Sequence, residues 1–171
     1  MECICKADLP YPEPEITEKS LYEVKLLMPA YAGRESETTA IFSYIYGHYV
    51  TIGLKGELSD CLEKIAISEM RHHDILGKAI VQLGGTPYIG GNYSYWQGGY
   101  VNYVKDPVAI LKNAIAGEKQ AIHDCETIAA RTRMKEIKIL IERIILDERV
   151  HVATLTKLLE YYSSSSSSTL S

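Results

Sequence analysis

The feature that most constrains this chain is a repeated motif, Glu-x-x-His, which occurs at Glu69–His72 and again at Glu148–His151. Each copy places a carboxylate and an imidazole one helical turn apart on the same face of a helix. One copy would be weak evidence, because the motif also arises by chance. Each copy, however, follows another glutamate by about 30 residues, Glu37 before the first and Glu118 before the second. The order Glu, Glu-x-x-His, Glu, Glu-x-x-His indicates two sets of metal ligands.

Apolar residues at helical spacing surround these glutamates and predict long helices. The first begins near Thr17 and closes in the segment 53–59, with Pro29 either kinking it or starting a new helix. The others cover about 59–83, 107–133 and 135–161. Glycines at 84 and 85 are typical of a helix end, and Asp106 followed by Pro107 is typical of a helix start.

The segment from Thr86 to Lys105 has no helical period and is rich in glycine and tyrosine. A connection of this length is uncommon within a compact domain. In a four-helix bundle it joins two consecutive parallel helices by spanning the bundle, with its aromatic residues packed on the surface. We therefore predict an all-α, up-down-down-up four-helix bundle with a long crossover between its second and third helices.

The length of 171 residues, 46% of them hydrophobic, is enough for one buried core. We expect one bundle over residues 17–162. Residues 1–16, which contain three prolines, are expected to be an extended arm rather than a packed element. Six consecutive serines follow the bundle, and we expect residues 163–171 to be a disordered tail.

The formal net charge of −4 leaves no basic stripe, so we do not expect a nucleic-acid partner. No apolar run is long enough to span a membrane, and the first residues do not resemble a signal peptide. We therefore expect a cytoplasmic protein. The four cysteines, Cys3, Cys5, Cys61 and Cys125, are unevenly spread, so we expect reduced thiols. A soft-metal site at Cys3 and Cys5 is the alternative, although no further thiol or histidine lies nearby in sequence.

Each of the four glutamates lies in the middle of an apolar stripe, where a carboxylate needs a proton or a partner. A buried salt bridge would need a cation on the same stripes. Arg71 and Arg149 are predicted to face solvent, and Arg34 alone could lean inward. Two divalent ions would balance four glutamates and two histidines. This mixture of carboxylate and imidazole suits iron or manganese.

The stretch Glu37-x-x-Ala40-Ile41-x-x-Tyr44 resembles the first-helix motif of bacterioferritins and rubrerythrins. The two Glu-x-x-His motifs are similar to those in the second and fourth helices of the same ferritin-like superfamily, and the resemblance covers roughly residues 20–160. It implies a centre of two iron ions, two manganese ions or one of each, with iron first. It also implies terminal ligands Glu37 and Glu118, bridging ligands Glu69 and Glu148, and one nitrogen ligand per metal from His72 and His151.

The chain departs from a typical rubrerythrin in two ways. It has no Cys-x-x-Cys motif of a rubredoxin module, and no additional glutamate lies one turn from Glu118, where Ala114, Ile115 and Ala121 stand instead. The electron donor is therefore unknown. Tyr44 shares the stripe of Glu37, either as a catalytic residue that donates a hydrogen bond or stops a radical, or as a core residue.

These observations predict an oxidoreductase of the ferroxidase or peroxidase type, in which a metal pair reacts with peroxide or dioxygen. The alternatives are an iron-binding or storage protein, and a structural coat component tethered by the serine tail. Thirteen tyrosines against one phenylalanine fit either redox-active phenols or a surface that packs the crossover and a partner. We expect a homodimer.

Overall fold

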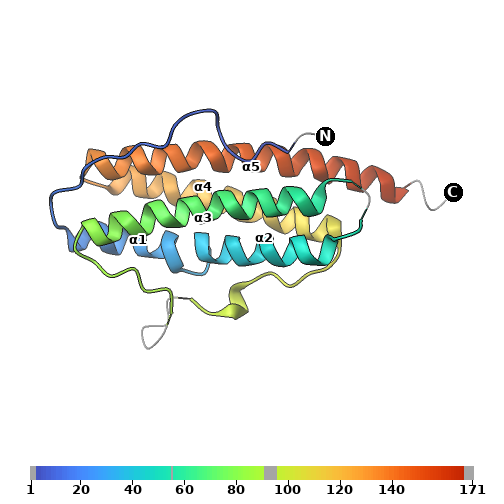
Figure 1. Cartoon of the computed structure of the whole chain (residues 1–171), viewed down its shortest axis with the longest axis horizontal. Coiled ribbons are helices and arrows are strands. Elements are labelled where there is room, and N and C mark those ends of the chain that lie inside the picture. Colours follow the sequence, from blue (N-terminus) through green and yellow to red (C-terminus); the bar gives the residue numbers. More distant parts are fainter. Residues whose placement is uncertain (1–2, 55, 91–95, 168–171) are drawn as a thin grey trace.

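The computed structural model describes residues 3–54, 56–90 and 96–167. Within them the chain forms five α-helices and one short 3-10 turn, with no strand: α1 (Leu21–Ala32), α2 (Glu37–Thr51), α3 (Leu58–Gln82), η1 (Gly98–Tyr100), α4 (Pro107–Arg131) and α5 (Lys135–Ser167). Figure 1 shows α1 and α2 end to end, α3 running back beside them, α4 parallel to α3, and α5 returning. The predicted all-α, up-down-down-up bundle is confirmed.

The predicted first helix is in fact two helices, and the break is not at the proline. Pro29 lies inside α1, and α1 ends where the N–H of Gly33 donates to the Pro29 carbonyl. A Cβ on residue 33 would stand 2.4 Å from that carbonyl oxygen, so only glycine fits this turn. Ser36 then caps α2 by accepting the N–H of Thr39. The break makes Glu37 the first residue of α2.

The crossover lies on the α1 and α2 side of the bundle (Figure 1). The indole N–H of Trp96 donates to Thr39 Oγ1 at 2.9 Å, and its ring stacks on Phe42. The ring of Tyr103 meets that of Tyr46 edge to face. Aromatic side chains therefore hold the described part of the crossover against α2, as the composition predicts. Residues 91–95 of the crossover lie outside the described residues.

The apolar core falls into two clusters, one toward each end of the bundle. The first includes Leu27, Ile80 and Ile141, and the second includes Leu62 and Leu155. On α3 and α5 the clusters leave a gap, and the residues in that gap are the buried polar residues of the two Glu-x-x-His motifs. The fold therefore holds a polar layer at mid-bundle between two dry regions.

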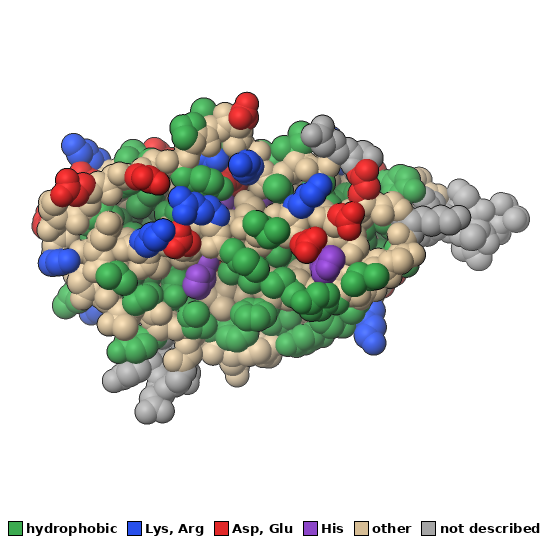
Figure 2. All heavy atoms as spheres, in the orientation of Figure 1, with side chains coloured by type: hydrophobic (Ala, Val, Ile, Leu, Met, Phe, Trp, Pro, Cys, Tyr) green, Lys and Arg blue, Asp and Glu red, His purple; other side chains and the backbone are tan. Residues whose placement is uncertain are grey.

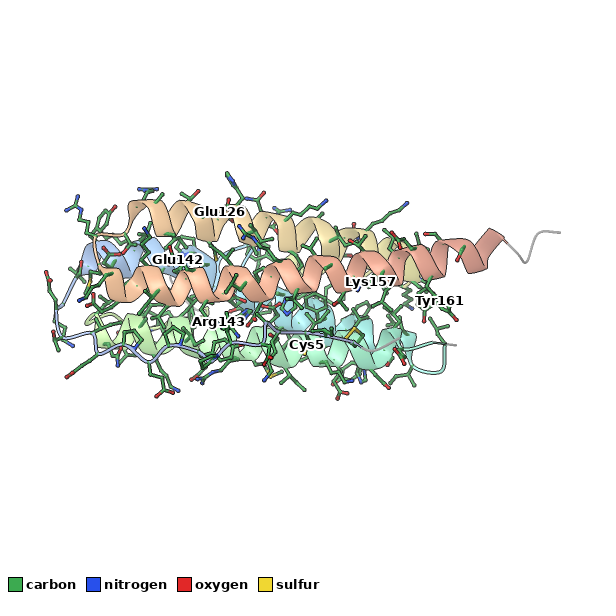
Figure 3. The ribbon with its side chains drawn as sticks, turned by 90° about the horizontal axis from the view of Figure 1, so that it is seen from above. Cys5, Glu126, Glu142, Arg143, Lys157 and Tyr161 are labelled. Atoms are coloured by element: carbon green, nitrogen blue, oxygen red, sulfur yellow. A yellow bond between two sulfur atoms is a disulfide. The ribbon has the colours of Figure 1, made fainter. Side chains whose placement is uncertain are left out.

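The described part of the amino-terminal arm has no helix or strand, and it packs on the bundle, whereas we expected an arm that does not pack. Figures 1 and 3 show it running alongside α5 and α3, and Ile16 at its end is buried. Cys3 and Cys61 form a disulfide, with Cα atoms 5.6 Å apart. The prediction of reduced thiols is therefore wrong for this pair. Their spacing in sequence gave no sign of it, because only the folded chain returns the arm to α3.

The carboxyl-terminal helix is longer than expected. Helix α5 continues to Ser167, so residues 163–167 of the predicted disordered tail are helical, and residues 168–171 lie outside the described part of the chain. An unbroken run of serines weakens a helix only modestly, so a long helix can extend into it. Among the described residues, no helix is long and apolar enough to cross a membrane.

Candidate metal centre

The structure brings all six predicted ligand residues together in the polar layer at mid-bundle. They form two groups whose ligand atoms lie within 4.8 Å of one another: Glu37, Glu69, His72 and Glu148 in one, and Glu69, Glu118, Glu148 and His151 in the other. Every member is buried. Helices α2, α3, α4 and α5 each contribute, so no single helix could build the cluster alone. The two groups share Glu69 and Glu148, which is the arrangement expected of two bridging carboxylates.

The imidazole of His72 points one nitrogen at the shared carboxylates. Its Nδ1 lies 3.0 Å from Glu69 Oε2 and 3.0 Å from Glu148 Oε1. Glu37 Oε2 is farther, at 3.7 Å. Glu37 therefore stands at the outer edge of this group, as a terminal ligand would.

The imidazole of His151 repeats this geometry in the second group. Its Nδ1 lies 2.9 Å from Glu69 Oε1 and 3.0 Å from Glu148 Oε2, and Glu118 Oε2 is again farther, at 3.7 Å. Each shared glutamate thus offers one oxygen to each histidine. The two copies of the sequence repeat therefore occupy positions in the site that are related by approximate two-fold symmetry.

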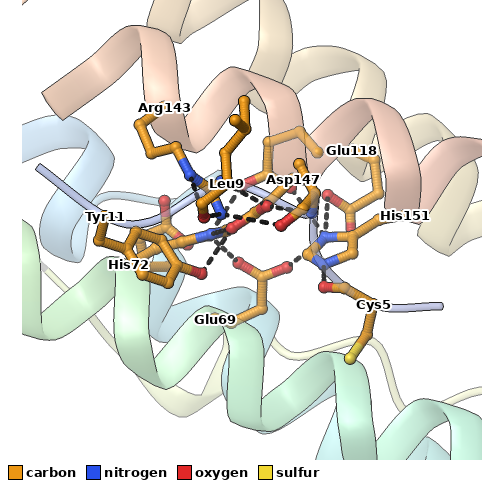
Figure 4. Close-up of polar contacts among 12 residues, drawn as sticks. Cys5, Leu9, Tyr11, Glu69, His72, Glu118, Arg143, Asp147 and His151 are labelled. Carbon is orange, nitrogen blue, oxygen red and sulfur yellow. Dashed lines mark hydrogen bonds and ion pairs between the residues drawn. The ribbon is translucent and has the colours of Figure 1, made fainter. Parts of the chain in front are cut away.

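The outer nitrogens of the two rings have different partners, shown in Figure 4. His72 Nε2 lies 3.0 Å from Asp147 Oδ2, whereas His151 Nε2 lies 2.7 Å from the Cys5 carbonyl oxygen in the arm. Both partners accept and do not donate, so a neutral imidazole keeps its proton on Nε2 and presents the lone pair of Nδ1 to the cluster. Histidines that bind metals usually donate their second nitrogen in this way.

Asp147 belongs to the site, although sequence reasoning did not identify it. Its carboxylate is fully buried and pairs with the buried guanidinium of Arg143 at 2.5 Å. Burial acts to raise the pKa of Asp147, but hydrogen bonds from His72, Tyr11 and the Ala7 N–H hold that pKa below its ordinary value. The available signal was Asp147 directly before Glu148, with Arg143 four residues earlier, but pairs at this spacing usually lie on exposed faces.

The predicted orientations of the other arginines are partly corrected. Arg34, the one arginine for which an inward orientation was considered, is exposed and pairs with Glu35. Arg149 faces solvent as predicted, where it pairs with Glu126, and Arg71 pairs with Asp74 in a half-exposed position. Among the arginines and lysines of the described residues, the buried side chain is that of Arg143, and it balances Asp147 outside the cluster of four glutamates.

Tyr44 is buried beside the second group, and its hydroxyl donates to Glu118 Oε1. Burial, reinforced by the charge of Glu118, raises the pKa of Tyr44 well above its ordinary value, so the phenol keeps its proton. Cys125 on α4 is also buried, and burial raises its pKa. The structure thus places Tyr44 next to a candidate ligand, and Cys125 is a protonated core thiol.

The charges at the centre of the cluster depend on the two histidines. Burial alone would lower the pKa of His72 and His151, but the facing carboxylates outweigh it and hold both pKa values well above the ordinary value. Burial would raise the pKa of Glu69 and Glu148. The imidazoles hold the pKa of Glu69 below its ordinary value, and the hydrogen bond with Glu118 together with the imidazoles does the same for Glu148. Without a metal, two imidazoliums therefore balance two carboxylates.

The terminal glutamates behave in the opposite way. Burial, followed by the charge of Glu69, raises the pKa of Glu37 well above the ordinary value. Burial, followed by the charge of Glu148, does the same for Glu118. The raised pKa values favour the protonated form of Glu37 and Glu118 when no cation is present, and a bound cation would favour the charged form.

The donor set fits a pair of hard divalent cations. Glu69 Oε1 and Glu148 Oε1 are buried and accept no hydrogen bond, which is costly for carboxylate oxygens unless a cation satisfies them. Each faces a histidine Nδ1 atom, and that atom carries a lone pair when the imidazole is neutral with its proton on Nε2. Two groups of three carboxylates and one imidazole, with two carboxylates in common, match the preference of iron and manganese for oxygen and nitrogen ligands.

A cavity of about 310 Å³ lies between α2 and α4 and reaches the cluster. Its inner end is lined by Glu37, Glu118 and Tyr44, and the crossover contributes Tyr100 and Asn102 nearer the surface. Small residues line much of the rest: Ala40, Gly47, Ala114, Gly117 and Ala121. The small side chains of α2 and α4 leave room for this cavity, whose volume is sufficient for a small molecule.

Comparison with known proteins identifies the family to which this chain belongs. A sequence model of the rubrerythrin family matches residues 25–159, which is most of the chain and includes all six residues of the cluster. The chain belongs to the rubrerythrin family. No curated protein matches this rubrerythrin-family chain by sequence at a significant level.

Solved structures show the same fold at low sequence identity. A manganese catalase from Anabaena superposes with a TM-score of 0.81 at 21% identity, over 92% of this chain and 80% of the other. A dodecameric thioferritin from Bacteroides fragilis gives 0.72 at 21%, over 91% and 94%. The di-iron bacterioferritin of Desulfovibrio desulfuricans gives 0.70 at 25%, over 83% and 80%. The rubrerythrin-family chain therefore shares the ferritin-like bundle of these proteins.

Proposed function

We propose that this protein is a dinuclear iron or manganese oxidoreductase that reacts with peroxide or dioxygen. The observation that carries the proposal is the sharing of Glu69 and Glu148 between two buried ligand groups. In this proposal they bridge two ions, Glu37 and Glu118 are terminal ligands, and His72 and His151 each supply one nitrogen. Iron is the first candidate, and manganese or a mixed pair the second.

The bound ions would supply electrons to the oxidant and polarise its O–O bond. The chain's own residues prepare the site for this chemistry. Asp147 and the Cys5 carbonyl hold the two rings with Nδ1 inward. The two apolar clusters keep the polar layer dry from both ends of the bundle, which strengthens every electrostatic interaction in it.

Tyr44 is the proposed catalytic residue of the chain. Its protonated hydroxyl lies at the inner end of the cavity on Glu118, where it can donate a hydrogen bond or a proton to an oxygen atom of the substrate. Its position also allows the phenol to act as a radical stop close to the metals.

Peroxide is the favoured oxidant. The structural similarity to a manganese catalase supports it. A reductive reaction would need a donor that is still to be identified. The similarity to a bacterioferritin and a thioferritin supports iron storage as the second candidate.

We propose that the working form is a cytoplasmic homodimer. Apolar side chains gather on the face of the molecule formed by α2 and α3 (Figure 2). The exposed apolar side chains of these two helices include Phe42, Tyr49, Ile67 and Met70, which are between 43% and 62% exposed. A cluster of this kind on a protein surface commonly marks a contact with another protein. Size-exclusion chromatography separates a dimer from the cage of many chains that mineral storage would require.

The decisive experiment combines metal analysis with rapid kinetics. Protein loaded with ferrous or manganous ions should hold about two ions per chain. Stopped-flow mixing should show oxidation by peroxide, by oxygen or by both. Oxygen evolution from peroxide would identify disproportionation. A protein that takes up two ions and is inert to both oxidants would contradict the enzymatic proposal, and one that takes up none would contradict the metal centre.

A further inference from the structure

The arm is part of the support of the candidate metal centre. The Cys5 carbonyl accepts from His151 Nε2 at 2.7 Å, and the adjacent Ile4 carbonyl accepts from the Thr154 hydroxyl at 2.6 Å. His151 and Thr154 lie one turn apart on α5. The arm therefore fixes the outer side of one histidine through main-chain atoms.

The same arm also supports the partner of the other histidine. The N–H of Ala7 donates to Asp147 Oδ1 at 2.7 Å, and the Tyr11 hydroxyl donates to Asp147 Oδ2 at 2.6 Å. Arg143 donates to the carbonyls of Ala7 and Leu9, at 3.2 and 2.9 Å. Both histidines thus depend on the arm, His151 directly and His72 through Asp147 (Figure 4).

Apolar packing near the beginning of the arm is limited, although Tyr11 and Ile16 farther along pack on the core. Ile4 and Leu9 are 53% and 56% exposed, so burial of these side chains does little to hold the segment down. The covalent tether is the disulfide between Cys3 and Cys61, placed two residues before the carbonyl that contacts His151. Without the tether, the beginning of the arm is held mainly by hydrogen bonds that water can replace.

We propose that Cys3 and Cys61 form a peroxide-sensitive thiol pair that locks the arm onto the metal centre. This inference rests on the proposed function, because it assigns the locked carbonyl of Cys5 the task of positioning a metal ligand. In the reduced state the arm opens and His151 loses its outer acceptor. In the oxidised state the acceptor returns and the site is complete. A disulfide in a cytoplasmic protein is usually of this reversible kind.

The oxidation is chemically balanced with peroxide as the oxidant. The sulfur of Cys3, which lies on the more accessible arm, attacks one peroxide oxygen, the O–O bond breaks, and a sulfenic acid and one water form. The thiol of Cys61 then attacks that sulfur, the S–S bond forms, and a second water leaves. Two thiols lose two electrons and peroxide gains them. Exchange with a small dithiol reverses the step.

The test uses the full-length protein in three forms: oxidised, reduced, and carrying Cys3→Ser. Lys6→Ala is the matched control, because it changes an exposed side chain of the arm between Cys5 and Ala7 and leaves the disulfide and the main-chain contacts intact. Hydrogen exchange of the Ala7 amide, measured without metal, reports whether the arm is closed. Titration with Mn²⁺ reports the affinity for each ion, and mass spectrometry after peroxide treatment reports the disulfide.

We expect exchange at the Ala7 amide to be about tenfold faster or more in the reduced and Cys3→Ser proteins. The affinity for the ion on the His151 side should fall roughly 10- to 100-fold in the same proteins, as for loss of an outer partner of a ligand. The affinity for the other ion should fall less, because Tyr11 and Arg143 still hold Asp147. The Lys6→Ala protein should match the oxidised wild type in both measurements. Peroxide should restore the disulfide and slow exchange in the reduced wild type.

Equal exchange and equal Mn²⁺ affinity in all forms would overturn the inference, and so would failure of peroxide to form the disulfide. These outcomes are distinguishable from failure of the proposed function. If the oxidised protein binds two ions and reacts with peroxide, but exchange in the arm does not depend on whether the thiols are oxidised, only the proposed lock is wrong. If the arm responds to the thiols but no ions bind, the metal centre is wrong.

Discussion

Asp147 Oδ2 lies 3.0 Å from Nε2 of His72, on the opposite side of the ring from the carboxylate cluster. The other oxygen of the same carboxylate pairs with Arg143. The charge of Asp147 is therefore balanced outside the cluster, and its hydrogen bond orients the ring without adding to the charge that the metals must neutralise. His151 has no such carboxylate and uses a main-chain carbonyl instead.

Replacing Asp147 by Asn should lower the binding affinity for the ion on the His72 side by roughly 10- to 100-fold and leave the affinity for the other ion nearly unchanged. The substitution also leaves Arg143 buried without its counter-charge, which should cost about 3–5 kcal/mol of unfolding free energy in the metal-free protein. Calorimetric metal titration and denaturant unfolding measure the two effects. Asp74→Asn, a half-exposed aspartate of α3, is the control. Equal weakening of both ions would contradict the assignment.

The shared and terminal glutamates should differ in metal stoichiometry. Glu69→Gln removes an oxygen donor from both groups, so the protein should lose tight binding of both ions. Glu37→Gln affects one group and should leave one ion in place. Metal analysis after dialysis distinguishes about zero ions from about one. If both variants retain the same number of ions, Glu69 does not bridge.

Tyr44→Phe should retain two ions per chain, because the hydroxyl contacts Glu118 from outside the ligand groups. The reaction with peroxide should slow by on the order of 10²-fold if the hydroxyl donates to the substrate. Stopped-flow kinetics on the loaded protein give the rate. Tyr46→Phe is matched in chemistry and lies on the same helix, where its hydroxyl bonds to the crossover. An unchanged rate in Tyr44→Phe would make that residue a core tyrosine.

Metal-free protein should lose stability as the pH rises. The pKa values of His72 and His151 are raised on folding, so their stabilisation is fully present below the unfolded value of about 6.5 and is lost as the pH passes the folded values. The raised pKa values of Glu37 and Glu118 act in the same direction. Thermal unfolding should therefore show a lower midpoint at pH 8.5 than at pH 6.5.

Metal-loaded protein should not show this loss, because cations replace the bound protons and bind more tightly as the pH rises. Thermal scans of the loaded protein at the same two pH values provide the comparison. Parallel pH profiles with and without metal would show that these groups are not the ligands.

Gly117 lines the cavity, and a Cβ at this position has no other heavy atom within 4 Å. Gly117→Ala should therefore stabilise α4 by about 0.5–1 kcal/mol and leave the reaction unchanged. Gly117→Leu should extend into the cavity and slow access of peroxide, with metal stoichiometry intact. Equal rates for the two variants, measured by stopped flow, would show that substrate enters elsewhere.

The positions of the six candidate ligands were predictable because helical periodicity is a local property. Glu69 and His72 share a face wherever that helix is placed, and an apolar stripe around them has to face the core. The crossover followed from length and composition in the same way. Asp147 was not predictable, since Asp and Arg four residues apart mark an exposed ion pair more often than a buried one.

The sequence by itself determined a bundle with a layer of carboxylates and histidines at its centre. The repeated motif, the helical period and the positions of the charged residues can all be read within single helices. Tertiary structure alone decided how that layer is supported. The arm returns to α5 across most of the chain's length, pairs Cys3 with Cys61, and places the Cys5 carbonyl on His151. Contacts between residues so far apart depend on how whole helices pack, and no local pattern records them.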